Sequence, residues 1–422
     1  MKAAVLGSGG REHALAWKLA GELGEGNVFV LPGNGGIRNS VPVDGTDTEQ
    51  ALAWCLDNEV DLVVVGPEKP LVQGMADVMR SSGLKVFGPC AAAARLEGSK
   101  GFAKQFMSRY DIPTADFVVC RGPQGAADFV RALGGRVVVK YDGLAAGKGV
   151  SVCGSEEEAL RAVERVETDY GSGAAFVVEE RLEGPELSVM AITDGRSAAL
   201  LPTSRDHKRA LDGDKGPNTG GMGAFCPVAD LPSGAHDRIW SRIVEPTLAG
   251  LRAEGIPYCG VLYFGIMLTE AGPMLLEYNV RLGDPEAEVL LPALKSSLVE
   301  VALRSIDGTL SGTSVVLEDG CFADVVLASG GYPSGYTTGL PITDVGPDDP
   351  DTLVFHAGTR RSGDRLETAG GRVLNVVGRG ATLDAALEKA YRRCRGISFD
   401  GMFYRRDIGG RRPGGSPAEV DR

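Results

Sequence analysis

The stretch Val137-Val-Val-Lys-Tyr-Asp-Gly-Leu-Ala-Ala-Gly-Lys-Gly-Val-Ser-Val-Cys153 has a β-branched run ending in lysine, a glycine-rich turn with a second lysine, and another β-branched run. β-Branched residues favour strands, so the stretch predicts a hairpin. Its glycines permit close backbone approach and positive φ, and Lys140 and Lys148 can offset negative charge. The stretch therefore predicts a flap over a polyphosphate, with an ordinary glycine-rich surface turn as the alternative.

The same stretch does not match a P-loop. A P-loop follows a strand with Gly-x-x-x-x-Gly-Lys-Ser/Thr and leads into a helix. Here Gly143 and Gly147 are one residue too close, Gly149 stands where the magnesium-binding hydroxyl belongs, and Val150 begins a predicted strand. We therefore expect a nucleotide-binding hairpin between strands.

Composition limits the classes of protein to consider. A length of 422 residues suits about two to four domains, and 43% hydrophobic with 24% charged residues is typical of a soluble globular protein. A net charge of −12 argues against a general nucleic-acid binder, and no apolar run approaches the roughly 18 residues of a membrane span. The eight cysteines have no CxxC or zinc-site spacing. We expect free thiols in a cytoplasmic protein without nucleic-acid or membrane partners.

Residues 1–90 alternate short apolar runs with helical stretches, which indicates a parallel α/β sheet with ligand sites at the carboxyl ends of its strands. A dinucleotide fingerprint fails here, because Glu12 occupies the third glycine position and no acidic residue ends the second strand. The loop at Gly9 and Gly10 can still bind a phosphate at a helix start, with a structural tight turn as the alternative. The expected strands are Ala3–Leu6, Val28–Leu31, Leu62–Val65 and Val86–Phe87, and the expected helices are Arg11–Gly21, Thr48–Asn58 and Leu71–Ser82.

The rest of the chain predicts α+β units. One helix is expected at Ala91–Tyr110, before a break at Asp111-Ile-Pro-Thr114. The expected fold class is a multidomain α/β and α+β protein. Its expected domains are an α/β domain at about 1–104, a two-lobed domain at about 105–318 (a small flap lobe at 115–190 and a larger lobe at 191–318), a C-terminal α/β domain at 319–408, and a polar tail at 409–422.

Acidic residues follow the strand predicted at Phe176–Glu179. The segment from Glu179 to Glu186 can present backbone amides to an adenine and a carboxylate to ribose hydroxyls. A solvated acidic turn is the alternative interpretation.

A later strand, Met274-Leu-Leu-Glu-Tyr-Asn279, places Glu277 and Asn279 on one face. Two oxygen ligands beside a polyphosphate suit Mg²⁺, which takes only one or two protein groups and keeps several waters. Arg281 follows and suits a carboxylate or a phosphate. The alternative is a strand edge with polar residues facing solvent.

The segment from Thr203 to Ala224 is dense in charge and then rich in turns. It can form a loop that closes on an anionic substrate, although a solvated charge run is the commoner outcome. His207 lies within it and is a candidate base or substrate contact. The remaining histidines, His13, His236 and His356, show no clustering in the sequence, which argues against a histidine-based metal site.

The order of these features resembles an ATP-grasp ligase, and the detailed strings resemble the phosphoribosylamine–glycine ligase family. The resemblance covers Met1 to about Ile408. The strings are Gly7-Ser-Gly-Gly-Arg-Glu-His-Ala-Leu15, Gly66-Pro-Glu-Lys-Pro-Leu-Val72, Leu96-Glu-Gly-Ser-Lys100, Lys140–Val150, Asp206-His-Lys-Arg209, Gly216-Pro-Asn-Thr-Gly-Gly-Met-Gly-Ala224 and Asn279-x-Arg-x-Gly-Asp-Pro-Glu286. Tyr141 departs from the small residue that is usual in the family after the strand-end lysine.

The resemblance implies that ATP phosphorylates the carboxylate of glycine and that the amine of 5-phosphoribosylamine then attacks glycyl phosphate. It implies ATP as co-substrate, Mg²⁺ or Mn²⁺, a monomer, and transient contact with neighbouring purine-pathway enzymes. The implied ATP-binding residues are Lys100, Lys140, Lys148, Glu179, Glu180, Leu182 and Glu186; the metal ligands are Glu277 and Asn279; the substrate-binding residues are Gly9, Gly10, Gly33, Asn34, Asp206, Thr219, Gly220 and Arg281; the catalytic residues are Arg281, Lys140 and Asp206.

Two other functions stay open at this point. One is another ATP-grasp carboxylate–amine ligase, against which the segment from residue 206 to 224 argues. The other is a nucleotide sensor without turnover, against which the intact Lys140, Glu277, Asn279 and Arg281 argue.

Overall fold

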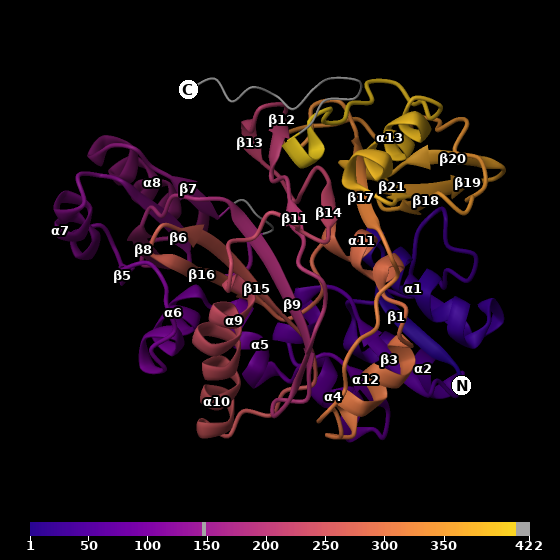
Figure 1. Cartoon of the computed structure of the whole chain (residues 1–422), viewed down its shortest axis with the longest axis horizontal. Helices are drawn as coiled ribbons and strands as arrows, with labels where there is room; N and C mark the ends of the chain where they lie inside the picture. Colours follow the sequence, from indigo (N-terminus) through magenta and orange to yellow (C-terminus); the bar gives the residue numbers. More distant parts are fainter. Residues whose placement is uncertain (146–148, 411–422) are drawn as a thin grey trace.

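A computed structural model describes residues 1–145 and 149–410. Lys148 of the predicted flap and positions 411–422 of the predicted tail lie outside the described residues. Figure 1 shows a flap lobe at one end of the molecule, a larger lobe in the middle, and the N-terminal and C-terminal domains together at the other end. This arrangement confirms the predicted multidomain fold class. Within the described residues, no helix has the length and apolar character needed to cross a bilayer.

The N-terminal domain is a parallel sheet in the order β2-β1-β3-β4. Its strands are buried apolar runs, as predicted. A helix predicted over Leu71–Ser82 is instead two helices, because Gly74 between them adopts a left-handed conformation with φ of 86°. The elements are β1 (Ala3–Gly7), α1 (Gly10–Leu23), β2 (Val28–Pro32), α2 (Thr48–Asp57), β3 (Leu62–Val65), α3 (Glu68–Val72), α4 (Met75–Ser81) and β4 (Lys85–Phe87).

The single helix predicted over Ala91–Tyr110 is also two helices, α5 (Ala91–Gly98) and α6 (Lys100–Arg109). Ser99 between them is extended, with φ of −136° and ψ of 111°, and its hydroxyl accepts a hydrogen bond from the Phe102 amide at 3.1 Å. Such a cap satisfies one of the free amides at a helix start. The break makes Lys100 the first residue of α6.

The flap lobe is an antiparallel sheet in the order β5-β8-β6-β7. The predicted hairpin is confirmed, because β6 pairs with β7 and Lys140 lies opposite Val150. Tyr141, the unusual residue of the hairpin, stacks on Tyr170 with ring centroids 3.7 Å apart. The elements are β5 (Phe117–Arg121), α7 (Gln124–Ala132), β6 (Val137–Tyr141), β7 (Val150–Val152), α8 (Glu156–Tyr170) and β8 (Ala175–Glu180).

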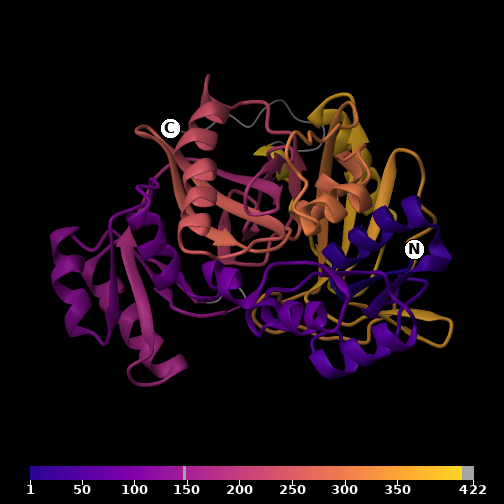
Figure 2. The ribbon, with the colours of Figure 1, turned by 90° about the horizontal axis from the view of Figure 1, so that it is seen from below.

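The larger lobe is built on an antiparallel sheet in the order β10-β9-β15-β16. Figure 2 shows helix α10 along one side of this lobe and the flap lobe standing apart below it. The elements are β9 (Glu186–Thr193), β10 (Ala198–Leu200), α9 (Ala235–Ile239), a π-helical turn (Trp240–Val244), α10 (Glu245–Ala253), β15 (Gly260–Thr269), β16 (Gly272–Asn279), α11 (Glu286–Ala293) and α12 (Leu298–Ile306).

The C-terminal sheet has the order β11-β14-β17-β21-β18. Two of its strands, β11 and β14, come from the charged segment near residue 206, so the chain leaves the larger lobe and returns. This crossing brings that segment beside the C-terminal domain. The elements are β11 (Arg205–Asp206), β12 (Arg209–Leu211), β13 (Lys215–Asn218), β14 (Ala224–Cys226), β17 (Cys321–Ala328), β18 (Thr352–His356), β19 (Thr359–Ser362), β20 (Arg365–Thr368), β21 (Arg372–Gly380) and α13 (Leu383–Cys394).

Candidate active site

A cavity of about 1130 Å³ lies between the lobes and reaches both terminal domains. Pockets for a single small ligand usually occupy about 300–1,000 Å³, so this cavity has room for more than one. It collects most of the residues predicted for a site, from segments far apart in the sequence. The predicted residues that line it are Lys100, Lys140, Glu179, Glu180, Leu182, Glu186, Asp206, Thr219, Gly220, Glu277, Asn279 and Arg281.

Strand β16 supplies the centre of the cavity. Glu277 and Asn279 alternate onto the same face of the strand and both line the cavity. On the neighbouring strand, Gly265 lies directly opposite Glu277, and a Cβ at Gly265 would come within 3.2 Å of the Glu277 Cγ atom. The glycine thus leaves space for the Glu277 side chain.

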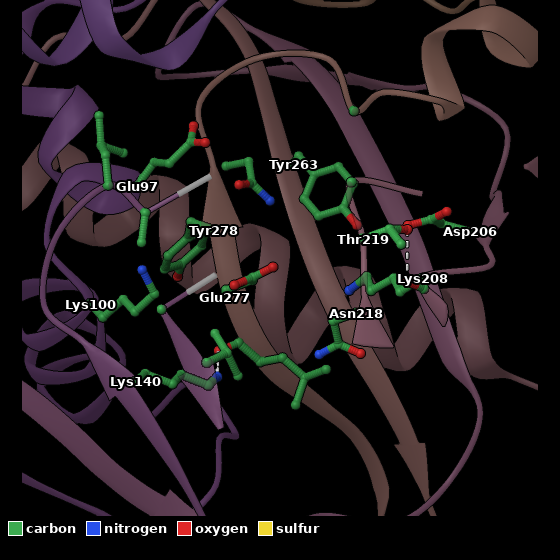
Figure 3. A pocket seen from close by; sticks show the side chains of 18 of the residues that line it. Glu97, Lys100, Lys140, Asp206, Lys208, Asn218, Thr219, Tyr263, Glu277 and Tyr278 are labelled. Atoms are coloured by element: carbon green, nitrogen blue, oxygen red, sulfur yellow. Dashed lines mark hydrogen bonds between the residues drawn. The ribbon is translucent and has the colours of Figure 1, made fainter. Parts of the chain in front are cut away.

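Cations surround Glu277. In Figure 3 its carboxylate lies between Lys100 and Lys140 on one side and Lys208 on the other. Burial by itself raises the pKa of Glu277, but Lys208, Lys140 and Lys100 together lower the pKa below its ordinary value. An ionised carboxylate with an amide oxygen two residues away fits a divalent cation that also binds phosphate oxygens.

Lys100 ties helix α6 to the base of the flap. Its Nζ donates to the carbonyl oxygen of Gly143 at 3.0 Å, and the Gly101 amide donates to Asp142 Oδ1 at 3.1 Å. Burial lowers the pKa of Lys100. The first turn of α6 is therefore held against the turn that carries the flap.

Lys140 forms a buried ion pair with Glu179. The two residues are diagonal neighbours on β6 and β8, since Glu179 lies opposite Val138, and Nζ of Lys140 is 2.5 Å from Oε1 of Glu179. The other carboxylate oxygen of Glu179 is 2.6 Å from Nζ of Lys104. One carboxylate thus pairs with two ammonium groups inside the cavity wall.

The linker between β8 and β9 passes along the cavity. Leu182 of the linker lines it, together with Glu180 at the end of β8 and Glu186 at the start of β9. Oε2 of Glu186 is 2.7 Å from Nζ of Lys208, and the nearby carboxylates, Glu186 foremost, raise the pKa of Lys208 well above its ordinary value despite burial. Lys208 is therefore a cation of the site at neutral pH.

Asp206 marks the far end of the cavity. It is held on β11, next to the Thr219–Gly221 loop and the turn at Pro285. Gly221 has φ of +113°, and a Cβ there would lie 2.3 Å from Pro285 Cδ and 2.7 Å from Asp206 Oδ1. Burial and the neighbouring Glu286 raise the pKa of Asp206 well above its ordinary value.

The C-terminal domain holds the Thr219–Gly221 loop. The Gly220 amide donates to the hydroxyl of Tyr332 at 3.1 Å. The Arg372 guanidinium donates to the carbonyl oxygen of Gly220 at 2.6 Å and to that of Asp284 at 3.0 Å. The loop therefore depends on contacts that cross more than a hundred residues of sequence.

Arg281 is held by two carboxylates at the edge of the cavity. Its guanidinium is 2.9 Å from Glu97 Oε1 and 3.4 Å from Glu68 Oε2, and it also reaches Asn279 Oδ1 at 3.4 Å. The residue that we predicted as an anion ligand thus has acidic neighbours that fix its orientation.

The four predicted substrate residues of the N-terminal domain do not line the cavity. The Gly9 amide donates to Glu12 Oε2 at 2.6 Å, and a Cβ at Gly10 would lie 2.2 Å from Asn375 Nδ2. The side-chain amide of Asn34 donates to the carbonyl oxygens of Ser8 and His356. At Gly33 a Cβ would lie 2.3 Å from the hydroxyl oxygen of Ser40, so these positions are engaged in packing.

His207, the candidate base or substrate contact, does not line the cavity. Nε2 of His207 accepts a hydrogen bond from the Gly409 amide at 3.0 Å, and burial lowers its pKa to about 4. We predicted no histidine cluster, but Nδ1 of His13 accepts a hydrogen bond from the His356 amide at 2.8 Å. Across residues 1–145 and 149–410, no group of three His, Cys, Asp or Glu side chains is placed to hold a metal.

Sequence reasoning missed several residues of the cavity wall. Lys104 and Lys208 could have been suspected from the helical spacing after Lys100 and from the charged run near residue 206. Glu68, Glu97 and Asn218 lie within strings that carry the family resemblance, whereas Tyr263, Tyr332 and Arg372 carry no local signal. The missed residues are Glu68, Glu97, Lys104, Lys208, Asn218, Tyr263, Tyr332 and Arg372.

Family models match almost the whole chain. The N domain of phosphoribosylglycinamide synthetase matches residues 1–97, its ATP-grasp (A) domain residues 98–287, and its C domain residues 322–411. These matches follow the same order as the sheets of the structure.

Individual proteins are similar over the same length. A phosphoribosylamine–glycine ligase from Agrobacterium fabrum is 44% identical over 414 residues, covering 97% of this chain and 98% of that protein. The human trifunctional purine biosynthetic protein adenosine-3 is 46% identical over 418 residues, covering 96% of this chain and 41% of that protein.

Solved structures show the same relationship. The crystal structure of a phosphoribosylamine–glycine ligase from Thermotoga maritima has a TM-score of 0.86 at 40% identity and covers 97% of this chain and all of that one (100%). A biotin carboxylase domain from Hydrogenobacter thermophilus has a TM-score of 0.72 at 17% identity, covering 96% of this chain and 91% of that chain. The second likeness shows the fold alone.

Proposed function

The chain belongs to the phosphoribosylglycinamide synthetase family, and on this premise we propose that it joins glycine to 5-phosphoribosylamine at the expense of ATP. The products are glycinamide ribonucleotide, ADP and phosphate, the second step of purine biosynthesis. The observation that carries this proposal is that the lysines near the flap, Glu277 with Asn279, and the Asp206 and Thr219 region face one common cavity.

At the flap end, we propose that Lys100 and Lys140 bind the phosphates of ATP and that Lys148 joins them from the flap. Phosphoryl transfer depends mainly on positioning and on neutralising charge, and both described lysines line the cavity. Glu179 and Glu180 at the end of β8, Leu182 in the linker and Glu186 at the start of β9 would hold the adenine and the ribose.

Glu277 and Asn279 are the residues that would hold the divalent cation, Mg²⁺ or Mn²⁺. When bound, the cation would supply charge neutralisation for the phosphate groups during transfer. The ionised state of Glu277 and the short distance along β16 to Asn279 support this assignment.

The proposed reaction has two steps. A carboxylate oxygen of glycine attacks the γ-phosphorus of ATP, and the bond to the ADP oxygen breaks. The amine nitrogen then attacks the carbonyl carbon of glycyl phosphate, phosphate leaves, and the nitrogen loses a proton. We propose that Arg281 stabilises the acyl phosphate, that Thr219 and Gly220 position the substrates, and that Asp206 accepts a hydrogen bond from the amine.

An omission assay tests the function. We expect ADP release only when ATP, glycine and 5-phosphoribosylamine are all present, because the amine must consume glycyl phosphate for turnover to continue. The measurement is ADP formation with each substrate left out in turn and with D-alanine in place of glycine. Turnover with D-alanine would favour another ATP-grasp ligase, and nucleotide binding without any ADP release would favour a sensor.

The substitution Asp206→Asn tests the amine site. We expect kcat/KM for the amine substrate to fall about tenfold, since weakening a hydrogen bond at a buried site costs roughly 1–3 kcal/mol, while the KM for ATP stays unchanged. Steady-state kinetics with each substrate varied separate the two. Asp230→Asn is the matched control, because Asp230 is exposed and pairs with Arg205. An equal loss in both variants would contradict the assignment.

We also propose a monomer that works in the cytoplasm and makes transient contact with neighbouring enzymes of its pathway. All eight cysteines are free, which suits a reducing compartment.

A further inference from the structure

Lys104 is a buried cation of the cavity wall that the reaction described above does not use. It is 2% exposed and lies one turn after Lys100 on α6. Its Nζ is 2.6 Å from Glu179 Oε2 and donates to the Thr114 hydroxyl at 2.6 Å, which in turn donates to the carbonyl oxygen of Leu275 at 2.6 Å. These contacts hold Lys104 between the flap sheet and β16.

The charged groups of Lys140, Glu179 and Lys104 lie in a row, with the Glu179 carboxylate in the middle. Its two oxygens face Lys140 and Lys104, and all three side chains are nearly or fully buried. Two ammonium groups and one carboxylate leave one positive charge. Without Lys104, the remaining pair of Lys140 and Glu179 would be neutral and would offer no net charge to a polyphosphate.

Binding of a phosphate to Lys140 has a cost that Lys104 can offset. To bind a phosphate, the Lys140 ammonium group must donate hydrogen bonds to the ligand, which weakens its pairing with Glu179. An uncompensated buried carboxylate facing a polyphosphate is strongly unfavourable, and Lys104 is the second partner that keeps Glu179 compensated. The hydrogen bond to Thr114 keeps Lys104 in place because the hydroxyl is itself anchored on β16.

We propose that Lys104 is a positioning residue for nucleotide binding: it neutralises Glu179 so that Lys140 is available to the phosphates. The inference rests on the proposed use of ATP and adds a residue that need not touch the nucleotide. It predicts that the effect of losing Lys104 depends on whether position 179 carries a charge.

A double-mutant cycle tests this dependence. The affinity for a non-hydrolysable ATP analogue with Mg²⁺ is measured by calorimetry for the wild type, Lys104→Met, Glu179→Gln and the double variant. We expect Lys104→Met to weaken binding at least about tenfold in the wild type, because a charge of the buried triad is lost, and less than about threefold in the Glu179→Gln background. An equal loss in both backgrounds would overturn the proposal.

Thr114→Val serves as a second variant, because it removes the anchoring hydroxyl but keeps the charge of Lys104. We expect Thr114→Val to weaken binding of the ATP analogue less than Lys104→Met does. An equally large loss of affinity would show that the position of Lys104 matters and not its charge, and would overturn the proposal. Thermal unfolding of every variant identifies those that fail to fold.

The pH profile of the wild type gives a readout that needs no variant. Burial lowers the pKa of Lys104 to about 8, against the opposing effect of Glu179; the other charged groups facing it are Lys140 on β6 and Glu277 on β16. The ammonium form exists below this pKa, so affinity should fall as pH rises through about 8 and the fall should be smaller in Lys104→Met. A flat wild-type profile from pH 7 to 9 would overturn the proposal. Because binding needs neither glycine nor the amine, failure here is distinct from failure of the omission assay.

Discussion

Glu277→Gln is expected to lower kcat by about 10²–10³-fold, the loss that follows removal of one main electrostatic contact in an active site. Glu277 lies at the centre of the cavity, and Lys208, Lys140 and Lys100 hold its pKa below the ordinary value. The amide keeps the shape but removes the negative charge that attracts a divalent cation. Steady-state kinetics across a range of Mg²⁺ concentrations measure the effect.

The control for this substitution is Glu270→Gln. Glu270 lies on the same hairpin, at the exposed turn between β15 and β16, so its loss tests for a general effect on the hairpin. We expect full activity from it. A well-folded Glu277→Gln variant with near-full activity would refute the metal assignment, and partial rescue by higher Mg²⁺ would support it.

Lys140→Met is expected to lower kcat/KM for ATP by about 100-fold, through a higher KM for ATP together with a lower kcat. Lys140 lines the cavity at the end of the flap strand and its Nζ is 2.5 Å from Glu179. Nearby carboxylates, Glu179 foremost, raise the pKa of Lys140 despite burial, so it is charged throughout the neutral range. Its loss removes a phosphate contact and leaves Glu179 paired with Lys104 alone.

Initial rates at varied ATP, with glycine and the amine saturating, measure this loss. Lys85→Met is the matched control: Lys85 begins β4 and pairs with Asp307 away from the cavity. An unchanged KM and kcat for Lys140→Met would count against the phosphate contact. A change in the KM for glycine alone would instead assign Lys140 to glycine binding.

Local patterns predicted several elements of this site correctly. The β-branched runs around the glycine turn predicted the hairpin of β6 and β7, because both strands are close in sequence and pair directly. The two-residue period of a strand predicted that Glu277 and Asn279 share a face. The first apolar runs predicted the parallel N-terminal sheet, since strands buried on both faces need continuous apolar residues.

Local patterns failed where a single backbone conformation or a distant partner decides the outcome. The helix predicted over Ala91–Tyr110 is broken at Ser99, whose hydroxyl caps the second half. The phosphate site at Gly9 and Gly10 stays a prediction, but in the structure Gly10 is closely approached by Asn375, from a strand of the C-terminal sheet. Nothing near residue 10 in the sequence indicates that contact.

The sequence by itself determined the fold class, the family and the position of the main charged groups, because each rests on residues within one strand, turn or helix. Only the tertiary structure decided which charges meet. The pairing of Lys140 and Lys104 with Glu179 follows from the order of β5, β8 and β6 and from the packing of α6, and the Thr219–Gly221 loop depends on Arg372. Burial then raises the strength of these pairings, since charges interact more strongly away from water, and burial is a property of the whole fold.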